Sequence, residues 1–341
     1  MKAKVRKRIN ILIRLLIMLV TVLFLYDQIF YRRDFSSIID LIVNLFHSSR
    51  FYSYMAVLFV MMIVNQALET FKWKLLIDKL EIVGFNRAFT AILTGIAVSM
   101  FMPNRTGDYF GRVFILERSS HVKAILVTII GSYAQLLTTM IAGCLGLIFF
   151  LPVYYHETLV LHPWMYAAMM VVVSITLAAA TLLYFNVPLL NELLAAIFRK
   201  KYEKLLEYTG VFALYSRVEL LNLLLLSIAR YLVFSFQFYL LLILFEVNIG
   251  YLPAMMLIAI SYLILTLIPT LALTELGVRG SVSYYLFGLY FTMGGLWNET
   301  TGMAILAASS SLWMINIALP ALLGILFVYR LKFIRRNDVA G

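Results

Sequence analysis

The sequence predicts an all-α polytopic membrane protein, an inverted-repeat helical bundle with two broken, re-entrant helical hairpins. Its 341 residues are 63% hydrophobic and only 13% charged, with a mean hydropathy of +0.94. A soluble protein of this size would need more charge to cover its surface. The apolar runs are long and alternate little, which favours helices over a β-barrel. We expect one transmembrane domain, residues 1–341, without a soluble domain.

Charge and cysteine content exclude several classes of site. The formal net charge is +11, but the basic residues cluster beside apolar runs, where they set orientation and meet anionic lipid rather than nucleic acid. The single cysteine, Cys144, lies within an apolar run, so an intrachain disulfide is excluded and a thiol metal site is not expected. The histidines show no ligand spacing, and no nucleotide-binding or catalytic motif appears. We therefore expect no metal, no cofactor and no enzymatic activity.

The apolar runs define the predicted helices in chain order. The first, Ile11–Phe30, follows a basic cluster and has no small-residue cleavage site after it, which predicts an uncleaved helix. A helical span needs about 20 apolar residues, and Ala88–Met102 is too short to provide one. The remaining runs are Phe51–Thr70, Val122–Leu151, Trp164–Phe185, Val218–Phe245, Tyr251–Pro269, Ser281–Trp297 and Gly302–Tyr329.

Basic residues decide the predicted orientation, because they favour the cytoplasmic side. If the basic residues before Ile11 are cytoplasmic, Ile11–Phe30 crosses the membrane outward and Phe51–Thr70 crosses it back. A full crossing by Ala88–Met102 would place the later basic clusters outside. A hairpin that enters from the cytoplasm and turns near Pro103 keeps them all inside. We therefore predict a re-entrant hairpin and cytoplasmic N- and C-termini.

The second broken pair is less constrained by charge. Tyr251–Pro269 with Ser281–Trp297 can form two full spans or a hairpin entered from outside, and both leave the chain on the same side. Symmetry favours the hairpin, because residues about 51–151 and about 218–330 then form two pseudo-repeats of opposite orientation, as in many secondary transporters. Residues 186–217 are expected to form an interfacial cytoplasmic connector between them.

The first hairpin contains a concentrated set of polar and turn-forming residues. Arg105 and Arg112 offer forked donors that suit phosphate or carboxylate. Asp108 is a candidate to cap the returning helix, hold an arginine or bind a cationic group. The alternative is an interfacial loop whose arginines only satisfy the charge rule. The predicted break residues, which end the helix and permit tight turns, are Pro103, Gly107 and Gly111.

The second hairpin repeats this pattern. Glu275 and Arg279 are four residues apart, so they can share one helix face and form an ion pair. As candidate site residues they would line the same head-group site as the first hairpin. The alternative is a local salt bridge that stabilises the break. The predicted break residues here are Pro269, Gly277 and Gly280.

Arg230 is the clearest isolated candidate, because it lies near the middle of Val218–Phe245. An ionisable residue at membrane depth is costly and is a functional candidate by default. It is expected to contact a ligand, a carboxylate such as Glu275, or both. Secondary candidates are Glu69 and Gln237, with Asn65 and Gln66 as smaller ones. Glu69 with Lys72 is alternatively a boundary pair, the interpretation we favour for Lys72, Trp73 and Lys74.

These residues resemble a known family. The strings Phe101–Arg112 and Thr274–Gly280, with Lys72–Leu76 before them and Arg230 between, resemble the flippase-like transmembrane region of lysylphosphatidylglycerol synthases of the MprF type. The resemblance covers roughly residues 51–329, and Asp108 stands where many relatives have glutamate. The chain ends at Gly341, so we expect no fused synthase domain. The resemblance implies translocation of a lipid, or a lipid-linked head group, in a bacterial cytoplasmic (inner) membrane.

Three functions stay open at this stage. The first is a flippase or scramblase that moves an anionic phospholipid or lipid-linked head group between leaflets. The second is a secondary transporter of a small soluble anion, which the same broken helices would suit. The third is a non-transporting scaffold for envelope lipid synthesis. A homo-oligomer and a lipid-biosynthetic enzyme partner also stay open.

Overall fold

The computed structural model describes most of the chain, and the regular elements in that part are all helical. The described residues are 12, 19, 49–100, 102, 105–117, 119–158, 163–187, 192, 208–268 and 272–328. Within them, five helical stretches are long and apolar enough to cross a membrane: Arg50–Ile77, His121–Pro152, Trp164–Phe185, Arg217–Leu244 and Glu299–Ile325. The prediction of an all-α polytopic membrane protein is therefore confirmed. The predicted first helix and most of the connector lie outside the described residues.

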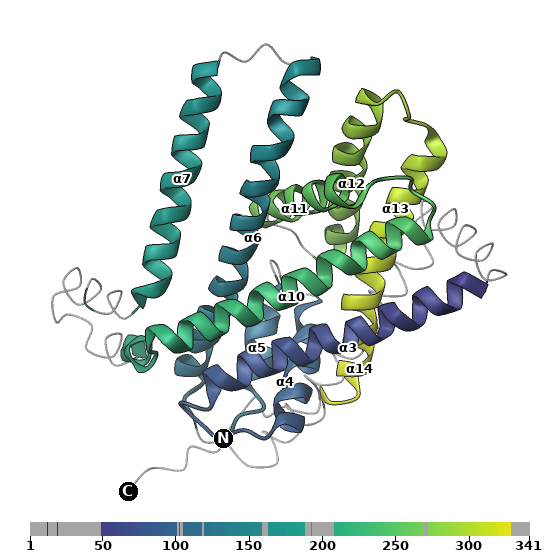
Figure 1. Cartoon of the computed structure of the whole chain (residues 1–341). Helices are drawn as coiled ribbons and strands as arrows, with labels where there is room; N and C mark the ends of the chain where they lie inside the picture. Colours follow the sequence, from purple (N-terminus) through teal and green to yellow (C-terminus); the bar gives the residue numbers. More distant parts are fainter. Residues whose placement is uncertain are drawn as a thin grey trace, which may run out of the picture.

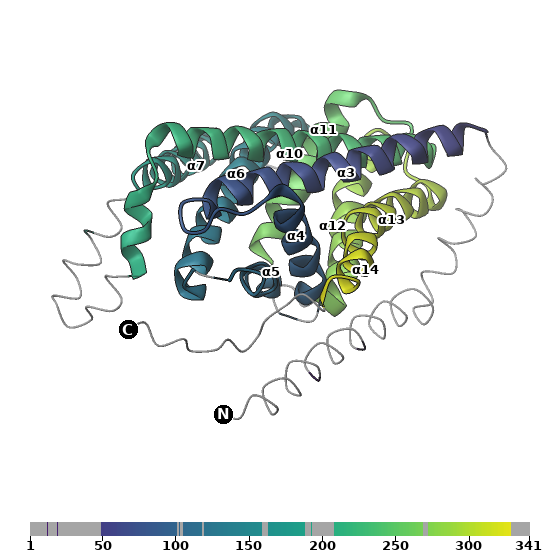
Figure 2. The ribbon, with the colours of Figure 1, turned by 90° about the horizontal axis from the view of Figure 1, so that it is seen from below.

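Two long antiparallel helices lie side by side across the bundle. They are α3 (Ser49–Ile77) and α10 (Arg217–Leu244), and both pack on α6 (His121–Thr158) (Figures 1 and 2). A short 3-10 turn, η3 (Gly210–Leu214), precedes α10. The Ser216 hydroxyl then accepts from the Glu219 backbone N–H in a capping box, which explains why α10 starts there.

The first broken segment forms a short helical hairpin. It consists of α4 (Phe85–Ser99) and α5 (Gly107–Val113), which pack closely against each other. The 15 residues of α4 reach only about 22 Å, less than the roughly 30 Å hydrocarbon core. The hairpin therefore has the size expected of a re-entrant segment. Its entry from the cytoplasmic side stays a prediction, and Pro103 lies outside the described residues.

Gly107 and Gly111 have a different role from the predicted one. Gly107 is the first residue of α5 and Gly111 lies inside it, and a Cβ atom on Gly111 would stand 2.6 Å from the Cα atom of Gly95. Glycine is needed here because the α4 and α5 backbones touch, a common device in membrane helix packing. Among the described residues of this loop, Arg105 has left-handed backbone geometry, at φ 56°.

The second broken segment consists of α11 (Tyr251–Leu267) and α12 (Ala272–Met293). The chain leaves α11 at Ile268 with extended geometry, φ −93° and ψ 110°. This is the conformation that a following proline imposes, although Pro269 itself lies outside the described residues. Along its length α11 packs against α6, where a Cβ atom on Gly143 would stand 2.4 Å from the Leu263 Cβ atom.

The predicted extent of the second break was wrong. α12 begins at Ala272 instead of Ser281, so Gly277 and Gly280 are helical. The Glu275–Arg279 pair supports this first part of the helix, and a Cβ atom on Gly280 would stand 3.1 Å from Leu306 on the neighbouring helix. The break is therefore shorter than predicted, since α11 ends at Leu267 and α12 begins at Ala272.

The last span is interrupted by a π-helical turn. It runs through α13 (Glu299–Trp313), the π-helix η4 (Met314–Ala318) and α14 (Leu319–Ile325). α14 packs on α4, and α12 packs on α13, so the two broken segments share this span as a neighbour. α7 (Pro163–Phe185) stands beside α6 with most of its surface exposed (Figure 1). The inverted-repeat relation between the halves stays a prediction.

We expect Gly111→Ala to destabilise the protein, because its Cβ atom would press on backbone atoms of Gly95 and Thr94. Overpacking of this kind typically costs about 1–3 kcal/mol. Thermal unfolding of the purified protein in detergent measures the effect. Gly210→Ala is the matched control, because nothing lies within 4 Å of its Cβ position. Equal melting temperatures for the two variants would contradict the close contact of α4 and α5.

Cysteine labelling tests the orientation of the second broken segment. In a background without Cys144, we expect cysteines at Ala272 and Val278 to resist rapid labelling from the cytoplasm, because the hairpin enters from the opposite side. A membrane-impermeant maleimide applied to right-side-out and inverted vesicles measures this access. Ready cytoplasmic labelling of both positions would rule out the outside-entered hairpin.

Candidate functional site

A polar cavity lies where the two broken segments meet α3, α6 and α10. Its volume is about 380 Å³, and it also has apolar wall residues such as Ile92, Leu136 and Phe234. Such a volume lies within the range of small-molecule sites. The charged and amide side chains that line it are Asn65, Gln66, Glu69, Lys72, Arg105, Asp108, Arg112, Gln135, Arg230, Arg279 and Asn316.

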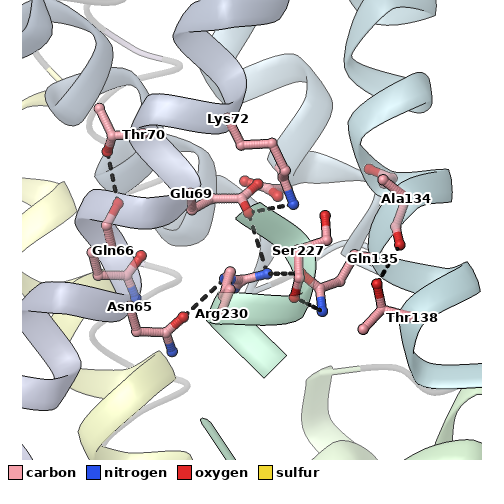
Figure 3. A network of polar contacts seen from close by, with 12 residues as sticks. Asn65, Gln66, Glu69, Thr70, Lys72, Ala134, Gln135, Thr138, Ser227 and Arg230 are labelled. Carbon is pink, nitrogen blue, oxygen red and sulfur yellow. Dashed lines mark hydrogen bonds and ion pairs between the residues drawn. The ribbon is translucent and has the colours of Figure 1, made fainter. Parts of the chain in front are cut away.

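The Glu69 carboxylate is the centre of the charge network (Figure 3). Its Oε1 atom accepts from Arg112 Nη1 at 2.7 Å. Its Oε2 atom lies 2.7 Å from Lys72 Nζ and 3.2 Å from Arg230 Nη1. Glu69 is buried, so this carboxylate and its three cations depend on one another for compensation.

Lys72 and Trp73 are buried in the interior of the bundle. Lys72 is only 2% exposed, and the Trp73 indole N–H donates to the Thr128 hydroxyl at 3.1 Å. Lys72 is therefore part of the buried charge network, and the position of these residues at the membrane boundary stays a prediction. Their place on the inner face of α3 depends on α6 packing against it, which the local sequence pattern does not show. Lys74, by contrast, turns away and pairs with Asp78.

Arg112 is held firmly from two sides. Its Nε atom donates to Asp108 Oδ1 at 2.9 Å, and a second bond joins its Nη2 atom to Asp108 Oδ2. With the bond to Glu69, the guanidinium has two carboxylate partners and is almost fully buried. Asp108 thus holds an arginine, one of its three predicted roles. The bidentate pair with Asp108 orients the guanidinium within α5, and the bond to Glu69 fixes α5 against α3.

Arg230 is held more loosely and faces the cavity. Its Nε atom donates to Asn65 Oδ1 at 2.9 Å, and its Nη1 atom donates to Gln135 Oε1 at 3.3 Å (Figure 3). Its side chain is 29% exposed, compared with 7% for Arg112. The predicted pairing of Arg230 with Glu275 was wrong, because Glu69 on α3 takes that place.

The π-helical turn adds an amide cluster to the same wall. Asn65 Nδ2 donates to Asn316 Oδ1 at 3.0 Å, and Gln66 Nε2 donates to the Asn316 backbone carbonyl at 3.4 Å. A π-helical turn shifts the backbone hydrogen-bond pattern and often marks a functional site. The buried Gln66 Oε1 atom has no hydrogen-bond partner in the described part of the chain, so it can accept from a ligand.

Two further arginines of the broken segments, Arg105 and Arg279, line the cavity. Arg279 Nε donates to Glu275 Oε1 at 3.0 Å, so this predicted pair is formed, and Glu275 is buried behind Arg279. Arg105 lines the cavity, and among the described residues no carboxylate lies within ion-pair distance of it. Glu275 is still its electrostatic neighbour. Within the described residues, no group of three or more His, Cys, Asp and Glu side chains could hold a metal ion.

The structure therefore gathers most of the predicted site residues around one cavity. Arg105, Asp108, Arg112, Arg230 and Arg279 line it directly, as does the secondary candidate Glu69.

Gln237 does not line the cavity. It is fully buried and its Nε2 atom donates to the Leu58 backbone carbonyl at 3.0 Å, which ties α10 to α3. Two lining amides, Gln135 and Asn316, were missed. Each is a lone amide within a long apolar run, which is the signal that could have identified them.

The fold and the cavity define a multi-pass membrane protein with a cation-rich binding site among its helices. Residues 11–319 match the family described as the lysylphosphatidylglycerol synthase TM region, and the chain belongs to this family. It is thus a membrane protein of a family related to lipid handling. Comparisons with curated proteins and with solved structures gave no match.

We expect Glu69→Gln to destabilise the protein strongly, because it leaves three cations together in a buried site. Loss of one partner from a buried ionic network typically costs about 3–5 kcal/mol. Lys72→Met should cost less, because Glu69 keeps Arg112 and Arg230 as partners. Thermal unfolding in detergent measures both, with exposed Glu299→Gln as the control. A Lys72→Met effect as large as that of Glu69→Gln would contradict the central role of the carboxylate.

Proposed function

We propose that this protein is a lipid translocase, a flippase or scramblase that moves an anionic phospholipid or lipid-linked head group between leaflets of a bacterial cytoplasmic membrane. The observation that carries the proposal is the cation-rich cavity, which is built from both broken segments and from spanning helices. A bilayer is the environment in which such charges are most costly unless they serve a ligand.

The cavity wall supports a ligand that has both a charged and an apolar part. Arginines and amides lie beside apolar residues, among them Leu136, which is exposed. We propose that a phosphate binds the arginines while the acyl or prenyl chains stay in the bilayer. The head group keeps all its covalent bonds, so the proposal requires no catalyst.

Movement of one half against the other is the proposed route of translocation. The cavity takes residues from both α5 and α12, the helices that carry the two broken segments. In transporters with inverted repeats, a site between the halves opens to alternate sides as one half rocks against the other. The loosely held Arg230, which contacts α3 and α6 from α10, is the residue best placed to follow the ligand.

We expect Arg230→Ala to abolish lipid translocation without preventing folding, because its guanidinium is partly exposed and faces the cavity. Reconstitution into vesicles with a fluorescent anionic phospholipid in one leaflet measures the rate. The matched control is Lys79→Gln, which removes a positive charge from an exposed pair with Glu219, outside the cavity.

Translocation at the unaltered rate in Arg230→Ala would contradict the proposal. If the unaltered protein binds no lipid but transports a small soluble anion, the transporter alternative is favoured. If lipid synthesis by a partner enzyme depends on this protein and is unimpaired in cells carrying Arg230→Ala, the scaffold alternative is favoured.

A further inference from the structure

The arginines of the cavity fall into two groups according to their partners. Arg112 is bonded to Asp108, and Arg279 is bonded to Glu275. Lys72 lies against the Glu69 carboxylate at 2.7 Å. Three cations are therefore neutralised by three carboxylates, and these pairs need no ligand.

Two positive charges remain without a carboxylate of their own. Arg230 shares the Glu69 Oε2 atom at 3.2 Å and otherwise contacts neutral amides. Arg105 has no described carboxylate within ion-pair distance, although it lines the cavity. An uncompensated charge is costly in a site of low dielectric, so the cavity favours an anion that neutralises both arginines.

We infer that the cavity selects a lipid phosphomonoester, whose head group carries close to two negative charges, over a phosphodiester lipid, which carries one. This inference rests on the proposed function and names its substrate class. A phosphomonoester loses its second proton with a pKa of about 6, so it carries −1.5 to −2 charges near neutral pH. Forked guanidinium donors match its terminal oxygens, and a terminal phosphate exposes one more oxygen to them than a diester does.

The backbone at Arg105 is consistent with a ligand role for its side chain. Arg105 adopts φ 56°, a region that non-glycine residues rarely occupy. Residues held in such conformations cluster at ligand-binding sites, where the surrounding structure maintains them. An arginine with no described ion pair therefore lines the same cavity as the amide cluster of Asn65 and Asn316.

The test measures binding of matched short-chain lipids to the full chain in detergent by calorimetry. Dihexanoyl phosphatidic acid and dihexanoyl phosphatidylglycerol have the same chains and differ in head-group charge. Near pH 7.5 we expect the phosphomonoester to bind on the order of tenfold more tightly. The preference should disappear near pH 5, where the phosphomonoester is protonated to a monoanion.

The pH dependence has an internal control. The cavity also contains Glu69, Asp108, Lys72 and its arginines, with Tyr109, Tyr231 and Tyr262, and no described histidine lines it. Titration of a charged group of the wall would also change the binding of phosphatidylglycerol. A change confined to phosphatidic acid therefore reports the ligand and not the protein.

Two substitutions at Arg105 sharpen the assignment. Arg105→Asn removes the charge with a residue that tolerates this backbone region, and it should bring the two lipids to equal affinity. Arg105→Lys keeps the charge and should retain most of the preference. Lys79→Gln, which lies outside the cavity, should leave the preference unchanged.

The outcomes separate this inference from the proposed function. Equal binding of both lipids near pH 7.5, or tighter binding of phosphatidylglycerol, would overturn the phosphomonoester selection and leave lipid translocation standing. Binding of glycerol 3-phosphate or inorganic phosphate as tightly as phosphatidic acid, with no contribution from the chains, would point to a soluble anion and overturn both.

Discussion

Burial of the Glu69 carboxylate is the constraint on which the site depends. A buried carboxylate must be paired, and this one is contacted by Lys72 from its own helix, Arg112 from α5 and Arg230 from α10. The same network therefore joins three elements that are far apart in the chain. Because each cation also depends on Glu69, the position of the hairpin and the shape of the cavity are coupled.

Close helix packing places the groups that this network connects. Glycines let α5 lie on α4 and let α14 lie on α4, so the short hairpin is held against two neighbours. The π-helical turn then presents Asn316 to Asn65 and Gln66. Apolar contact thus positions the hairpin, while amides and ion pairs orient the side chains that face the cavity. This division is common in membrane bundles, where apolar burial alone gives little specificity.

The two groups of arginines have different consequences for ligand binding. Arg112 is neutralised, buried and multiply bonded, so it stabilises the frame. Arg230 shares Glu69 with two other cations, and Arg105 has no carboxylate within ion-pair distance among the described residues, so a ligand anion can compensate their charge. The site therefore combines one firmly held arginine, Arg112, with two that are held less tightly, Arg230 and Arg105. Such an arrangement suits a ligand that must bind and then leave.

Periodicity and composition were sufficient to predict the helices, because a long apolar run in a bilayer must satisfy its backbone hydrogen bonds internally, as a helix does. The sequence also predicted the two broken segments, the importance of Arg230 and the Glu275–Arg279 pair. A charge within an apolar run is costly in a membrane, so it marks a paired or functional position. Only the tertiary structure decided the partners. Glu69 rather than Glu275 pairs with Arg230, Lys72 turns inward, and the glycines of α5 serve packing. Those outcomes depend on which helices touch, and contacts between residues distant in the chain leave no local pattern to read.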